Sequence, residues 1–122
     1  MNEKENNLLA KTFDFALRII KSYKFLCEVK KEYTLSNQLL RSGTSIGANS
    51  EEAFGSSSKK EFRVKLFISY REAKETKYWI RLMKESDYLP DSIVVSLLDD
   101  LEQILKILGT ILKKVSQKQK EP

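Results

Sequence analysis

The sequence predicts an all-α protein, an up-down-up-down antiparallel four-helix bundle with long helices. The 122 residues include only four glycines and two prolines, which leaves little material for turns and therefore few connections. Apolar residues recur at intervals of three and four over long segments, which is the period of an α-helix. Short polar links separate these segments, and short links place consecutive helices antiparallel. The chain is long enough to form one domain, residues 1–122, around its own core.

The first predicted helix covers residues 3–31 and contains no interior glycine or proline. Its main apolar stripe follows the three-and-four spacing and consists of Leu9, Phe13, Ala16, Ile20, Tyr23 and Cys27. A second set widens the stripe: Leu8, Phe15, Ile19 and Leu26. A stripe this wide predicts a helix that contacts more than one neighbour.

The single cysteine, Cys27, lies among apolar residues, so we expect it to be buried rather than a reactive thiol. One cysteine forms no intramolecular disulfide, which suits a reducing cytoplasm. The N-terminal segment is polar and contains acids, unlike a secretory signal, and no apolar run approaches the roughly 18 residues that a membrane span needs. We therefore expect a soluble, cytoplasmic protein without a membrane partner.

The second predicted helix covers residues 35–54, with Thr34 or Ser36 as its N-cap and Gly55 as a left-handed residue at its end. It contains Gly43 and Gly47, each of which costs roughly 1 kcal/mol relative to alanine inside a helix. Small residues allow another helix to approach closely, so the sequence predicts tight packing on this segment as the compensation.

The third and fourth predicted helices cover residues 59–85 and 90–117. Ser58 and Glu61 fit a capping box at the start of the third, and Pro90 suits the first turn of the fourth. The apolar face of the third contains Phe62, Leu66, Ser69 or Tyr70, Ala73, Thr76 or Lys77, Ile80 and Met83. The seam of the fourth contains Val94, Leu97, Leu98, Leu101, Ile104, Leu105, Leu108, Ile111, Leu112 and Val115, a coiled-coil-like pattern.

Positive charge is unevenly distributed along the chain. The formal net charge is +5, and residues 58–86 carry nine bases against four acids, whereas residues 87–112 carry five acids and one lysine. An assembly of such chains would show one basic and one acidic surface, and a basic surface attracts phosphate backbones at long range. The alternative is that the lysines only form a solvated helix face.

Two signatures resemble a known family. They are LRSGTSIGAN at residues 40–49, followed by EA at 52–53, and KEF at 60–62, KL at 65–66 and EAKETKYWIRL at 72–82. With them the chain resembles the four-helix-bundle proteins encoded in intervening sequences of bacterial 23S ribosomal RNA genes. The resemblance implies a small cytoplasmic bundle that forms a homo-oligomer, commonly a pentamer around a central opening, with no established enzymatic activity. It also extends to the accessory protein of diversity-generating retroelements, which implies a reverse transcriptase and nucleic acid as partners.

Nucleic-acid binding is the specific activity that the residues favour most. The basic residues expected to contact phosphates, without reading bases, are Lys59, Lys60, Arg63, Lys74, Lys77, Arg81, Lys84, Lys113 and Lys114. Tyr70, Tyr78 and Trp79 are candidates to stack on bases, although their spacing favours core or subunit contacts. The competing interpretation is a structural assembly that recruits a protein partner and binds no nucleic acid.

A polar network between the second and third helices is also predicted. Its members share one face of each helix: Arg41, Ser45, Asn49 and Glu52 on the second, Glu72 and Glu75 on the third. If the faces meet, a glutamate can hold Arg41 in a bidentate pair, and the network would specify the register of the helices rather than add stability.

Enzymatic chemistry finds no support in the residues. The chain contains no histidine, which removes Ser-His and Cys-His nucleophilic arrangements and the Glu-x-x-His ligands of di-iron bundles. Glu72 with Glu75, or Asp99 with Asp100, supplies too few oxygens for a hard cation. We therefore expect no enzyme, no metal site and no cofactor.

Overall fold

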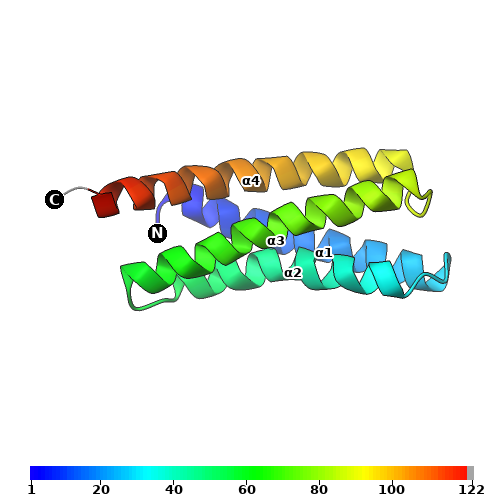
Figure 1. Ribbon diagram of the computed structural model, residues 1–122, viewed down its shortest axis with the longest axis horizontal. Helices are drawn as coiled ribbons and strands as arrows, with labels where there is room; N and C mark the ends of the chain where they lie inside the picture. The colour runs from blue at the N-terminus through cyan, green and yellow to red at the C-terminus, as the bar shows by residue number, and fades with distance from the viewer. Residues whose placement is uncertain (121–122) are drawn as a thin grey trace.

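The computed structural model describes residues 1–120, with side chains up to residue 116, and confirms the predicted fold class. Four helices run α1 Glu3–Glu28, α2 Thr34–Phe54, α3 Lys59–Glu85 and α4 Asp91–Lys120. They form an antiparallel bundle in which α2 packs on α1 and α3, and α4 packs on α3 and α1 (Figure 1). The start of α1 and the end of α4 lie at the same end of the bundle as the α2–α3 link, which we call the termini end, while the other two links lie at the opposite end (Figure 1).

The core face of α1 differs from the predicted one. The buried residues of α1 are Leu8, Thr12, Phe15, Ile19, Ser22 and Leu26. The main predicted stripe is only partly covered instead: Phe13 is 61% and Ile20 36% exposed, and its other members are half-buried, Leu9, Ala16, Tyr23 and Cys27. Both stripes have the same helical period, so the pattern alone does not say which one faces the bundle. The positions of α2 and α4 decide it.

The glycines of α2 lie against α1, which confirms the predicted close packing. A Cβ atom on Gly43 would lie 2.8 Å from both Cγ1 and Cγ2 of Ile19, and one on Gly47 would lie 3.4 Å from Cβ of Thr12. Gly43 and Gly47 are both buried. At Gly43 the neighbouring helix therefore leaves no room for a side chain, whereas at Gly47 an added Cβ atom would just touch α1.

The link between α1 and α2 corrects two predictions. The first helix ends at Glu28 rather than residue 31, because Lys31 has a left-handed φ of 55° that no helix continues. Neither Thr34 nor Ser36 caps α2. Instead, the Glu32 carboxylate accepts hydrogen bonds from the backbone N–H groups of Thr34, Leu35 and Ser36 at 3.2, 2.9 and 2.7 Å.

The predictions for the remaining helix ends are only partly right. Gly55 has a φ of −95°, so the predicted left-handed conformation at the end of α2 is wrong. The Glu61 N–H donates to the Ser58 Oγ at 3.1 Å, one half of the predicted capping box. The chain leaves α3 through Asp87, whose φ is 62°, before α4 begins at Asp91.

Candidate nucleic-acid interface

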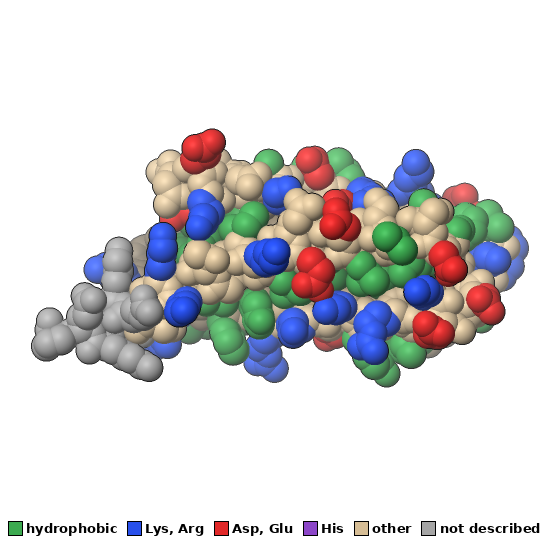
Figure 2. Space-filling model, turned by 90° about the horizontal axis from the view of Figure 1, so that it is seen from above, with side chains coloured by type: hydrophobic (Ala, Val, Ile, Leu, Met, Phe, Trp, Pro, Cys, Tyr) green, Lys and Arg blue, Asp and Glu red, His purple; other side chains and the backbone are tan. Residues whose placement is uncertain are grey.

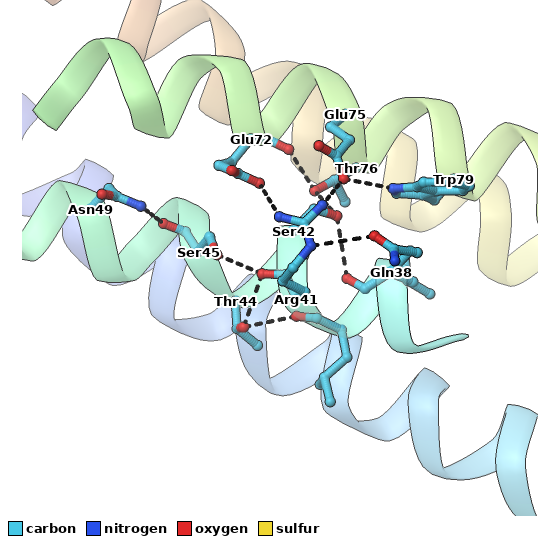
Figure 3. Close-up of polar contacts among 12 residues, drawn as sticks. Gln38, Arg41, Ser42, Thr44, Ser45, Asn49, Glu72, Glu75, Thr76 and Trp79 are labelled. Carbon is cyan, nitrogen blue, oxygen red and sulfur yellow. Dashed lines mark hydrogen bonds and ion pairs between the residues drawn. The ribbon is translucent and has the colours of Figure 1, made fainter. Parts of the chain in front are cut away.

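Arg41 of α2 lies between two glutamates of α3. Its Nη1 atom is 3.2 Å from Glu72 Oε2, and its Nη2 atom pairs with Glu75 Oε2. The indole N–H of Trp79 donates to the same Glu75 oxygen at 2.9 Å. Figure 3 shows the guanidinium pointing from α2 toward α3 into this acidic pair. The arrangement links the two helices near the middle of the bundle.

The six residues of the predicted network divide into three groups. The Ser45 hydroxyl donates to the Arg41 carbonyl at 2.6 Å, and the Asn49 amide donates to the Ser45 carbonyl at 2.8 Å, so both bond to their own helix (Figure 3). Glu52 pairs separately with Lys65 of α3 at 3.6 Å. The structure thus joins only Arg41 to Glu72 and Glu75, and a role in helix register stays a prediction.

The sequence offered Ser69 and Thr76 for the inward face of α3, but sequence reasoning missed that their hydroxyls form a buried row with serines of α2. Ser42 and Thr76 hydroxyl oxygens lie 2.9 Å apart, as do those of Ser50 and Ser69, and Ser69 also donates to the Ile46 carbonyl at 2.8 Å. Each pair is fully buried. Ser42 and Ser50 are eight residues apart on α2, and Ser69 and Thr76 are seven residues apart on α3, so the two residues of each helix share a face of that helix. In the sequence they stand among apolar residues, which makes the row hard to recognise.

The predicted phosphate-contacting residues gather mainly on α3 and the end of α4. Because these helices are antiparallel, the start of α3 lies beside the end of α4, so Lys59 and Lys114 line one cavity and Arg63 and Lys113 line another. Figure 2 shows Lys and Arg side chains along the whole length of the visible face, and most of the Asp and Glu away from the termini end. Acidic side chains are therefore fewer at the termini end, while the basic ones continue along the bundle.

The middle of the predicted basic row is partly neutralised. Lys77 lies 2.6 Å from Glu102 of α4. The hydrogen bond from Lys77 lowers the pKa of the Glu102 carboxyl, and the charges of Lys74 and Lys106 add to this effect. No other residue of the predicted set forms an ion pair within the described part of the chain. The unpaired cations at the termini end are therefore the better candidates for phosphate contacts.

The aromatic candidates occupy different environments. Tyr70 is half-buried beside α4, and Trp79 is half-buried and bonded to Glu75. Tyr78 is 52% exposed and stacks edge-to-face on Trp79. Phe67, which the sequence did not single out, is equally exposed at 52% and lies among arginines. The signal that could have identified Phe67 in the sequence is a large apolar side chain among the charged residues of α3.

The comparison with protein families shows to which family this chain belongs. The family model described as "23S rRNA-intervening sequence protein" matches residues 4–110. The chain belongs to this family. A solved structure, a protein of unknown function from the S23 ribosomal protein family of Bacteroides thetaiotaomicron VPI-5482, is 43% identical, with a TM-score of 0.89. The match covers 90% of this chain and 98% of that one. Among curated proteins, no significant match was found.

The family description and the neighbour's description assign no enzymatic reaction, and the neighbour is described as having unknown function. Within residues 1–120 of this intervening-sequence family member, no three His, Cys, Asp or Glu side chains cluster in a way that would hold a metal ion. The acidic pair at Asp99 and Asp100 is occupied by protein groups, since Asp100 pairs with Arg18 at 2.5 Å and Asp99 accepts from Gln103 at 3.1 Å. No described helix is long and apolar enough to cross a bilayer.

Proposed function

We propose that this chain is a non-enzymatic, cytoplasmic, homo-oligomeric scaffold that binds the backbone of RNA or DNA through α3 and the end of α4. The observation that carries the proposal is the row of cations at the termini end. Lys59, Lys60, Lys113 and Lys114 are all exposed, and no described carboxylate lies within 4 Å of them. When unpaired surface cations bind a nucleic acid, they release the counterions condensed on its phosphates. This release favours binding that does not depend on the base sequence.

Self-association is supported by the outward stripe of α1. Phe13 is 61%, Leu17 52% and Ile20 36% exposed, and these residues share one side of the helix. Apolar side chains grouped on a charged protein are typical of a protein contact surface. Several copies of a weak phosphate-binding surface bind one polymer much more tightly than a single copy. The pentamer that the family resemblance implies is the state we propose for this assembly.

The second candidate is an assembly that recruits a protein, such as a reverse transcriptase, without binding nucleic acid. The same α1 stripe favours it, because an apolar surface can receive either a second copy or another protein. The two candidates differ in one property. Only nucleic-acid binding weakens steeply with salt through the α3–α4 cations.

A salt titration of mixed-sequence RNA and duplex DNA, followed by fluorescence anisotropy, tests the proposal. We expect log K to fall linearly with log salt. The variant Lys113→Gln/Lys114→Gln removes about two phosphate contacts, so the steepness of this fall should decrease by roughly 1.8 for the duplex. The matched control is Lys21→Gln/Lys24→Gln, two exposed lysines of α1 away from this surface, which should leave the slope unchanged. No binding at low salt would favour the protein-recruiting candidate.

A further inference from the structure

A groove of about 750 Å³ runs between α3 and α4 near the termini end. Its residues combine positive charge with aromatic and aliphatic surface, and the ones that matter here are Arg63, Arg71, Lys113, Phe67, Tyr70 and Leu112. The volume falls within the range of about 300–1,000 Å³ in which proteins hold small ligands or single nucleotides. The groove is thus large enough for more than a side chain of the protein itself.

No acidic side chain lines this groove. Within the described residues, no carboxylate lies within 4 Å of Arg63, Arg71 or Lys113. The Nε atom of Arg63 is buried and has no hydrogen-bond partner, an uncommon state for a buried donor. Three cations without counterions, on a half-apolar surface, are complementary to an anionic ligand.

The surface between these cations is apolar and open. Phe67 is 52% and Val64 46% exposed, although each lies beside a charged residue. On the opposite wall, a Cβ atom added to Gly109 of α4 would meet nothing within 4 Å. About half of the Phe67 side chain is therefore open to solvent, and the facing helix leaves space at Gly109.

We infer that this groove binds single-stranded nucleic acid, with a base stacked on Phe67 and the flanking phosphates held by Arg63, Arg71 and Lys113. The inference rests on the proposed function and adds the strand class to it. Aromatic side chains stack on unpaired bases of any sequence, and guanidinium groups bind phosphate oxygens in a bidentate manner. A duplex presents phosphates but hides its base faces, so it would leave Phe67 without a partner.

The surroundings of the groove favour a polymer over an acidic peptide helix. The positive charge continues past both ends of the groove, to Lys59, Lys60 and Lys114 at the termini end and to Lys74 and Lys106 toward the middle, all of them exposed. A strand with one charge per nucleotide uses such a row, in which the one neighbouring carboxylate named above, Glu102, is already paired with Lys77. An amphipathic helix needs a longer apolar strip than Val64 and Phe67 provide.

The test is anisotropy with a labelled single strand and a duplex of equal length, using the full chain. We expect the single strand to bind more tightly than the duplex, and Phe67→Ala to weaken the single strand about tenfold while changing the duplex less than about twofold. The matched control is Tyr33→Ala, which removes a similarly exposed aromatic, 55%, from the α1–α2 link at the opposite end of the bundle. A second variant, Gly109→Leu, fills the groove from α4 without changing charge and should also weaken only the single strand.

Three results would overturn the inference. If single strand and duplex bind equally, and neither Phe67→Ala nor Gly109→Leu has an effect, the backbone is bound but the groove is not used. If polyglutamate displaces the single strand as readily as an unlabelled strand does, the groove recognises charge alone. If Phe67→Ala dissociates the oligomer and weakens both nucleic acids together, Phe67 is a subunit contact. If the wild-type protein binds neither the single strand nor the duplex, the proposed function is wrong as well.

Discussion

At the scale of single residues, Gly43 and Gly109 are helical glycines in opposite surroundings. A Cβ atom on Gly43 would lie 2.8 Å from two carbons of Ile19, a fully buried and β-branched side chain that has little freedom to move away. The equivalent atom on Gly109 would meet nothing within 4 Å. The same substitution should therefore have opposite effects at the two positions.

We expect Gly43→Ala to lower the free energy of unfolding by about 1 kcal/mol, because overpacking of about 1–3 kcal/mol exceeds the gain in helix propensity of about 1 kcal/mol. Gly109→Ala should raise it by about 0.5–1 kcal/mol through propensity alone. Urea unfolding followed by circular dichroism measures both. A stabilised Gly43→Ala would show that α1 and α2 are not closely packed at this point.

At the scale of elements, the start of α2 depends on one carboxylate of the preceding link. Partial burial raises the pKa of Glu32, but the backbone N–H groups of Leu35, Ser36 and Thr34 and the Ser36 hydroxyl lower it more, so the pKa lies below its ordinary value of 4.5. A group with a lowered folded-state pKa stabilises the fold above its unfolded pKa. That stabilisation is lost as the pH falls through the folded pKa.

We expect Glu32→Gln to reduce stability at pH 7 by about 1 kcal/mol, the usual cost of weakening an N-cap. The difference from the wild type should shrink as the pH falls below about 4, where the wild-type carboxyl also becomes neutral. Thermal unfolding at a series of pH values measures this. Glu51→Gln, an exposed acid later on α2, is the control, and an equal pH dependence in both variants would contradict the capping role.

At the scale of the whole molecule, the bundle leaves one apolar stripe of α1 without a partner of its own. Phe13, at 61% exposed, is the most exposed large hydrophobic of this stripe, and Val95 on α4 is similarly exposed at 62% but stands beside no such stripe. If the stripe joins copies of the chain, a charge there should separate them, whereas the same charge on α4 should not.

We expect Phe13→Glu to shift the protein from an oligomer to a monomer in sedimentation velocity, and Val95→Glu to leave the oligomer intact. Both side chains are exposed, so the helical circular dichroism signal should not change. A wild-type chain that sediments as a monomer would remove the oligomer from the proposed function. An oligomer that survives Phe13→Glu would instead place the subunit contact on another surface.

The number, type and approximate bounds of the helices could be predicted from the sequence, because these depend on local pattern. The seam of α4 is the clearest case, with Val94, Leu97, Leu101 and Leu108 all buried. The close packing at Gly43 and Gly47 also followed from residue size alone. The grouping of Glu72 and Glu75 on one face of α3, and of Arg41 and Ser45 on one face of α2, also followed from spacing, because side chains three and four residues apart share a face.

Contacts between segments distant in the sequence were decided only by the tertiary structure. The sequence contained two apolar stripes on α1 with one period, and the packing of α2 and α4 chose Leu8, Phe15 and Ile19 for the core and left Phe13 outside. The Glu32 cap and the pairing of Lys77 with Glu102 depend on how the chain turns and which helices become neighbours. Local spacing determines which face a residue occupies, but only the assembled bundle determines what that face meets.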